Sequence, residues 1–111
     1  MDIIIDIQGF RDADEKFLPK EVALVMIDAP FVSHWIMLPP HPFGELLETV
    51  RRQNCWLSRN YHGIEWFDGE TNPKYFAIQL REIIRQTRHI YVRGIEKAHY
   101  LRNLISREIY N

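Results

Sequence analysis

The stretch IIIDI at residues 3–7 decides the fold of this chain. Its four isoleucines are β-branched and Gly9 is expected to end the run, a pattern that predicts a buried strand with one acid, Asp6, set into it. A charged side chain inside an apolar run needs a partner or access to water. The direction in which Asp6 points is therefore the central structural question.

Two more strands are expected before the first helix. Residues 21–27 (EVALVMI) and 31–38 (FVSHWIML) are rich in apolar and β-branched side chains, and Pro30 separates them. Three prolines within residues 39–42 prevent the second of these strands from continuing. Three successive strands joined by short turns favour an antiparallel meander.

After the prolines, the apolar residues recur every three or four positions and no longer every two. This spacing predicts a first helix over residues 42–53 and a second over 73–87, with Asn72 as the N-cap of the second. The aromatic segment between them, residues 54–71, is predicted to be a structured loop.

A short apolar strand at residues 89–92 and a third helix at 96–106 complete the pattern, and residues 108–111 look like the start of another element. The expected fold class is α/β with a mixed sheet, in the order β-β-β-α-loop-α-β-α. A chain of 111 residues is expected to form one domain. A longer protein, with this domain as its N-terminal part, is an open alternative.

The composition is that of an ordinary globular domain. Of the residues, 46% are hydrophobic and 26% charged, which argues against a disordered or fibrous chain. The net charge of -1 gives no overall basic field, although positive side chains crowd residues 81–102. A single cysteine and no leader peptide predict an intracellular protein, cytoplasmic or nuclear. No apolar run reaches the roughly 20 residues that span a bilayer, so no membrane contact is expected.

Three short segments carry a resemblance to a known family. They are Asp-Ile-Gln at residues 6–8, His-Gly-Ile-Glu at 62–65 and Val-Arg-Gly-Ile-Glu-Lys at 92–97. Together with the element order, they resemble the DEDD-type 3′-5′ exonuclease branch of the ribonuclease H-like fold over residues 2–107. The chain is also similar to uncharacterised arthropod proteins of this fold that are linked to transposons or viruses.

The resemblance implies a catalytic site made of carboxylates. Asp6 and Glu96 would hold magnesium or manganese, with Glu21 as a substitute ligand. Gln8, however, is a neutral amide where the family has a glutamate, and Lys97 competes with Glu96 for the position of the family's second aspartate. The family's last His and Asp would lie beyond residue 111.

Two functions from different classes follow from these departures. In the first, the domain is catalytically degenerate, needs no cofactor and works by binding, with the Lys97 ammonium in the place of the metal. In the second, it is a metal-dependent exonuclease that uses Asp6 and Glu96. Both require that Asp6 and residues 96–97 share one pocket.

Nucleic acid is the first candidate partner, because aromatic rings can stack unpaired bases while arginines hold phosphates. The candidate residues are Arg51, Arg52, Arg59, Tyr61, Arg81, Arg85 and Arg88. The alternative is that the helix arginines form a solvated face and that Trp56 and Trp66 cover the sheet or form a dimer contact, with the role of Tyr61 left open. A protein partner or a second copy would instead bind exposed aromatic side chains or a sheet edge.

No zinc site is expected, because the histidines lack finger-type spacing. Structural or surface roles are expected for His34, His41, His62, His89 and His99. Cys55, next to Trp56 and Leu57, is expected to pack in the core.

Overall fold

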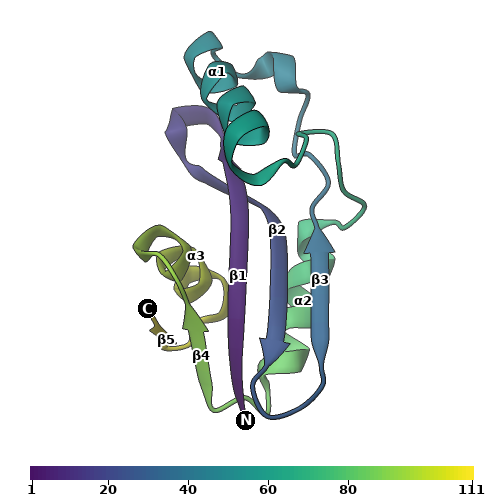
Figure 1. The fold of residues 1–111 in the computed structure, drawn as a ribbon, viewed down its shortest axis with the longest axis vertical. Helices are drawn as coiled ribbons and strands as arrows, with labels where there is room; N and C mark the ends of the chain where they lie inside the picture. The colour runs from purple at the N-terminus through teal and green to yellow at the C-terminus, as the bar shows by residue number, and fades with distance from the viewer.

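The computed structural model describes residues 1–111 as an α/β fold built on one mixed sheet of five strands (Figure 1). The strands are β1 (Asp2–Arg11), β2 (Phe17–Met26), β3 (Val32–Ile36), β4 (His89–Val92) and β5 (Ile109–Tyr110). Their spatial order is β3-β2-β1-β4-β5. β2 is antiparallel to β1 and β3, whereas β4 is parallel to β1 and β5. The predicted antiparallel meander is confirmed, and the segment after residue 108 adds the last strand.

Three α-helices accompany the sheet: α1 (Glu48–Leu57), α2 (Pro73–Ile84) and α3 (Ile95–Ile105). Asn72 caps α2 as predicted, because its side chain accepts a hydrogen bond from the Lys74 N–H at 2.9 Å. In Figure 1, α2 lies behind β2 and β3, and α1 crosses in front of β1. None of the helices is long and apolar enough to cross a bilayer.

The first helix begins later than its apolar spacing predicts. A 3-10 turn at Phe43–Glu45 is followed by Leu46 and Leu47 in extended conformation, with ψ of 150° and 151°, so α1 starts only at Glu48. It then continues past residue 53 into a π-helical turn at Ser58–His62. The prediction of a loop from residue 54 is therefore wrong, since helical turns reach His62.

Side chains of β1 alternate between the two faces of the sheet. Ile3, Ile5 and Ile7 are buried in the main core together with residues of α2 and α3, among them Leu80 and Leu101. Ile4 and Asp6 have the opposite parity and are exposed. The two C-terminal helices therefore cover one face of the sheet. We call the other face the open face.

The hairpin of β1 and β2 is longer than predicted, because Gly9 continues the strand and does not end it. The register shifts between Gln8 and Gly9, where Lys20 is the extra residue of β2, which makes this site a β-bulge. A Cβ atom at Gly9 would lie 2.3 Å from the Leu18 carbonyl oxygen. Only glycine fits this close approach without a shift of the backbone.

Lys20 is buried, with 2% of its surface exposed. Its ammonium donates hydrogen bonds to the carbonyl oxygens of Met37 at 2.8 Å and Trp66 at 2.7 Å, and to that of Asp68. Burial lowers the pKa of Lys20, and the nearby Asp68 carboxylate acts in the opposite direction. The three carbonyl contacts fasten the segment after Ile64 to the end of β3.

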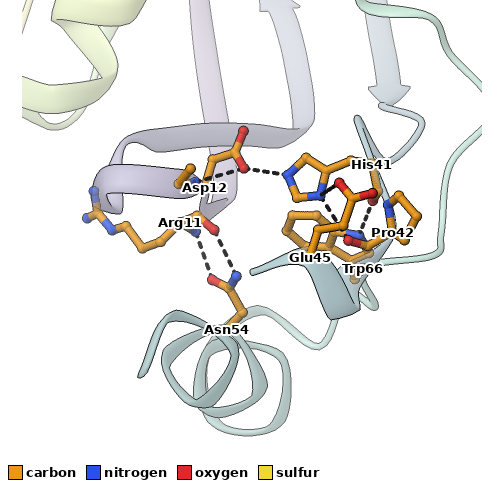
Figure 2. Close-up of polar contacts among 8 residues, drawn as sticks. Arg11, Asp12, His41, Pro42, Glu45, Asn54 and Trp66 are labelled. Atoms are coloured by element: carbon orange, nitrogen blue, oxygen red, sulfur yellow. Dashed lines mark hydrogen bonds and ion pairs between the residues drawn. The ribbon is translucent and has the colours of Figure 1, made fainter. Parts of the chain in front are cut away.

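A second, smaller apolar cluster fixes α1 to the sheet. It consists of Phe10, Leu46, Val50 and Trp66. Asn54 of α1, which is 1% exposed, accepts a hydrogen bond from the Arg11 N–H and donates one to the Arg11 carbonyl, each at 2.8 Å (Figure 2). Phe10 has the parity of Asp6, so α1 covers the far end of the open face.

Replacing Asn54 with Ala should lower the free energy of unfolding by about 2 to 4 kcal/mol, because the Arg11 N–H and carbonyl would both lose their partner in a buried place. Urea unfolding followed by far-UV circular dichroism measures this loss. The neighbouring Gln53→Ala substitution is the control, since Gln53 is exposed and the change should stay within about 0.5 kcal/mol. Equal losses in both variants would contradict a role of the Asn54 contacts.

Candidate functional site

Asp6, Gln8 and Glu21 lie on the open face of the sheet. Gln8 pairs directly with Glu21 across β1 and β2, and Asp6 pairs with Ala23 in the next row. Paired residues of an antiparallel ladder point to the same face, so Asp6 and Glu21 are diagonal neighbours, whose Cα atoms are typically about 7–8 Å apart. The sequence hypothesis that Glu21 reaches the region of Asp6 agrees with this geometry. Glu21 is already engaged, however, because its carboxylate binds the His34 ring at 2.7 Å.

Glu96 does not join this group. It lies in the first turn of α3, a helix that packs on the face of Ile5 and Ile7, and its carboxylate binds the Arg11 guanidinium at 2.7 Å. This contact raises the pKa of Arg11. The sheet therefore separates Asp6 from the helix that carries Glu96, and the predicted shared pocket of these two carboxylates is not formed.

Lys97 also makes no ion pair with Asp6. It is half-buried, and its stem lies next to Gly94, where the chain turns from β4 into α3. No salt bridge joins Lys97 to any carboxylate. The expected ion pair of the Lys97 ammonium with Asp6, in the place of a metal ion, is therefore not formed.

The residues present do not fit the two metal ions that the family resemblance implies. Two-metal sites need about four carboxylates around a pair of cations. Here Gln8 is an amide, Glu21 is bound to His34, and Glu96 is bound to Arg11 on the other side of the sheet. No group of three or more His, Cys, Asp or Glu side chains is arranged to hold a metal ion.

His62 lies at the junction of the open face and the π-helical turn. Its Nε2 is 3.1 Å from the Gly9 carbonyl, its Nδ1 accepts a hydrogen bond from the Ile64 N–H, and its ring meets Phe10 edge-on. Burial lowers the pKa of His62, against the hydrogen bond to Gly9 and the charge of Glu21. These contacts give His62 the structural role that its sequence context predicts.

The surface of α1 gathers the first group of candidate nucleic-acid residues. A shallow groove along the helix is lined by Arg51, Arg52 and Arg59, together with Trp56 and Phe43. Trp56 is 58% exposed and therefore does not cover the sheet, whereas Trp66 is buried, as predicted for a ring that covers it. Cys55 also lines the groove and is exposed, against the expectation of a core position.

The three arginines of this groove differ in whether they have a partner within the chain. Arg52 pairs with Glu48 one turn earlier at 2.7 Å, and Arg51 donates to the Gly44 carbonyl. Arg59 has no hydrogen bond or ion pair within the chain. A second depression on the other side of Trp56 is lined by Arg11. The exposed indole therefore lies between arginine side chains on both sides.

The second group of arginines lies elsewhere. Arg81 is on α2, on the opposite side of the sheet from α1. Arg85 is the C-cap of that helix and Arg88 follows it. Arg81 donates to the Leu104 carbonyl and Arg85 approaches Glu82 at 3.5 Å. Tyr61, in contrast, is exposed on the π-helical turn next to Arg59. The structure thus brings Arg51, Arg52, Arg59 and Tyr61 to one end of the molecule and separates them from the other three arginines.

A polar cluster next to α1 was not foreseen from the sequence. His41 Nε2 lies 2.6 Å from Asp12, its Nδ1 lies 2.9 Å from the Pro42 carbonyl, and Glu45 is 3.7 Å away (Figure 2). Both ring nitrogens face acceptors, which favours the doubly protonated imidazolium. The His41 carbonyl also accepts a hydrogen bond from the Trp66 indole. This cluster ties the tip of the β1–β2 hairpin to the turn before α1.

The two partners of this cluster shift each other's protonation. The hydrogen bond to Asp12 raises the pKa of His41, with a further contribution from the Pro42 carbonyl, against the effect of burial. Burial alone would raise the pKa of Asp12, but the hydrogen bonds from His41 and from the Ala13 N–H outweigh it, so the pKa is lowered. The pair therefore stays charged over a wider pH range than isolated side chains of the same two types.

The contribution of His41 to stability should fall as the pH rises. Because the folded-state pKa of His41 lies above its ordinary value of 6.5, the stabilisation is complete below about 6.5 and is lost as the pH passes through the raised pKa. The free energy of unfolding of the wild type minus that of His41→Asn should decrease between about pH 6 and pH 9 in urea titrations. His62 acts with the opposite sign in both proteins and cancels in this difference. A difference that does not change with pH, or the same pH dependence for the exposed control His99→Asn, would contradict the role of the Asp12–His41 pair.

Comparison with known proteins adds no further constraint on these residues. No family model, curated protein or solved structure matches the chain.

Proposed function

We propose that this chain has the ribonuclease H-like strand arrangement without the shared carboxylate pocket of that family, and that it binds single-stranded nucleic acid on the surface of α1. The strand arrangement supports the first part of the proposal. A meander of three antiparallel strands is followed, after two helices, by a strand that is parallel to β1 on its other side. The family resemblance also implies a mixed sheet, and this agreement supports the strand arrangement that we propose.

The separation of the carboxylates supports a binding function over phosphodiester hydrolysis. Asp6 retains the position of the family's first aspartate, but its predicted companions Gln8, Glu21 and Glu96 are an amide, a partner of His34 and a partner of Arg11. Without clustered carboxylates, no attacking water and leaving oxygen can be held between two cations.

The groove on α1 carries the proposal. Arg52, Trp56 and Arg59 follow each other at spacings of four and three residues, so their side chains lie on one side of the helical turns. An exposed indole offers a flat surface for an unpaired base, and flanking guanidinium groups bind phosphate oxygens. Glu48 neutralises Arg52, which leaves Arg51 and Arg59 without an acidic partner. The groove therefore has a net positive charge although the whole chain does not.

Replacing Trp56 with Ala should weaken the binding of a fluorescein-labelled single-stranded oligonucleotide, DNA or RNA, by roughly 5- to 150-fold, which corresponds to about 1–3 kcal/mol for one stacked base. Fluorescence anisotropy at low salt measures the dissociation constant. The matched control is Tyr75→Ala, which removes an exposed aromatic ring from α2 and should leave the affinity unchanged.

The salt dependence identifies the phosphate contacts. Arg59→Gln should reduce the slope of log affinity against log salt concentration by about 0.7 if Arg59 neutralises one phosphate of a single strand. Arg85→Gln on α2 is the control and should leave the slope unchanged, since it lies on the opposite side of the sheet. Equal effects of the two substitutions, or no binding at all by the wild type, would contradict the proposal. Manganese-dependent shortening of the oligonucleotide that disappears in Asp6→Ala would instead favour the exonuclease alternative.

A further inference from the structure

The open face of the sheet carries a continuous apolar stripe. One side chain from each strand contributes to it, in the spatial order Val32, Val25, Ile4, Tyr91 and Tyr110, and every neighbouring pair is a direct partner in the strand ladders. Each of these side chains is between 37% and 67% exposed. The rings of Tyr91 and Tyr110 lie 5.6 Å apart and extend the stripe to the last strand.

No element of the chain covers this stripe. α2 and α3 pack on the opposite face against Ile3, Ile5 and Ile7, and α1 reaches only the end of the open face that contains Phe10. Scattered apolar side chains are normal on a protein surface, but a contiguous row across a whole sheet is typical of an interaction surface. We call the row from Val32 to Tyr110 the apolar stripe.

Acidic side chains border the apolar stripe on both sides. Asp6 lies in the adjacent row beside Ala23 and His34, and it has no hydrogen-bond or ionic partner in the chain. Glu21 follows one row further along the same face, and Asp2 lies on the other side of the stripe, where it binds His89 at 3.0 Å. On this face Arg93, directly after β4, is the nearest cationic side chain by register, and it makes no ion pair.

The dimensions of the stripe fit a helix. Five strands at a spacing of about 4.8 Å give a row about 19 Å long. A helix rises about 1.5 Å per residue, so about 13 residues, or between three and four turns, span it. A helix with apolar residues three and four positions apart presents a matching stripe to such a surface.

The charge pattern selects among the possible occupants. Nucleic acid phosphates would be repelled by Asp6 and Glu21. A second copy in a symmetric face-to-face pair would bring apolar stripes together but would also concentrate the carboxylates of both copies in one buried interface. A partner with basic side chains beside its apolar residues meets neither obstacle.

We propose that the apolar stripe is the docking site for an amphipathic helix of a partner protein, with lysine or arginine on the flank that lies next to Asp6. Burial of the stripe supplies most of the affinity, and the unpaired Asp6 carboxylate selects for a basic flank. This site is separate from the nucleic-acid surface of α1 and does not depend on it.

Two synthetic helical peptides of about 18 residues, long enough for the apolar stripe at 1.5 Å per residue, test the proposal. They share a leucine face and differ only in lysine or glutamate on the flank. The lysine peptide should bind the wild-type chain roughly tenfold more tightly than the glutamate peptide in fluorescence anisotropy, a difference of about 1.4 kcal/mol. Ile4→Lys, in the centre of the stripe, should weaken binding of the lysine peptide by roughly tenfold or more. Ile78→Lys is the matched control, because Ile78 is also an exposed isoleucine, 60% against 48% for Ile4, and lies on α2.

Asp6→Asn separates the charge contribution from the apolar one. It should reduce the preference for the lysine peptide to about twofold or less while the glutamate peptide binds as before or more tightly. Several outcomes would overturn the proposal: equal binding of both peptides, no binding of either, or equal effects of Ile4→Lys and Ile78→Lys. A concentration-dependent dimer in sedimentation that Ile4→Lys dissolves would assign the stripe to a second copy. Loss of oligonucleotide binding in Ile4→Lys with unchanged peptide binding would assign it to nucleic acid.

Discussion

The alternation of side chains along β1 is the constraint on which the rest of the structure depends. β1 is hydrogen-bonded on both sides, to β2 over nearly its whole length and to β4 over its first half. Its odd-numbered isoleucines therefore all enter the main core, and Asp6 lies on the opposite face. A slip of one residue would bury Asp2 and Asp6 under α2 and α3 and expose Ile3, Ile5 and Ile7. The cost of burying two carboxylates without partners excludes that register.

The other end of the hairpin is held by polar contacts more than by apolar area. The cluster around Phe10 is small, and three polar side chains hold its surroundings in place: Asn54 on the Arg11 backbone, Lys20 on three carbonyl groups, and His41 between Asp12 and Glu45. Each of them satisfies backbone groups or charges that a loop covering a sheet would otherwise leave unpaired. The position of α1, and hence of its arginines, depends on these contacts.

Periodicity was sufficient to predict the elements that form the main core. The apolar alternation of β1 and β2, the Asn72-Pro73 start of α2 and the short strand β4 all appear in the sequence, because each depends on neighbours within a few residues. The start of α1 was missed since Phe43, Leu46 and Leu47 have helical spacing but belong to a 3-10 turn and two extended residues. The contacts of Lys20 with Trp66 and Asp68, and of Asn54 with Arg11, join residues more than 40 positions apart in sequence, and no local pattern reports them.

The separation of Asp6 from Glu96, in contrast, follows from parity. Ile5 and Ile7 must face a covering layer. That layer includes α3, which follows β4, the parallel neighbour of β1, and crosses over the sheet to β5. Any acid at an even position of β1 then points away from α3. The family resemblance implies a shared pocket of Asp6 and Glu96. The alternation of side chains along residues 3–7 instead directs Asp6 to the face away from α3, and the structure agrees with the alternation.

This separation also gives a physical reason why the two proposed binding surfaces, on one side of the sheet, carry opposite charge. The arginines of α1 and the carboxylates of Asp6 and Glu21 are both on the side that α2 and α3 leave free, with His62 and Phe10 between them. A phosphate chain held on α1 is repelled by the carboxylates, and a basic helix held on the apolar stripe is repelled by the arginines. Under the two proposals, ligands of opposite charge are therefore directed to different ends of the same face. Binding of one ligand also weakens the repulsion that the other ligand meets there. In the proposed helix docking, Asp6 acts through its own charge, which a bound cation at a catalytic aspartate would cancel.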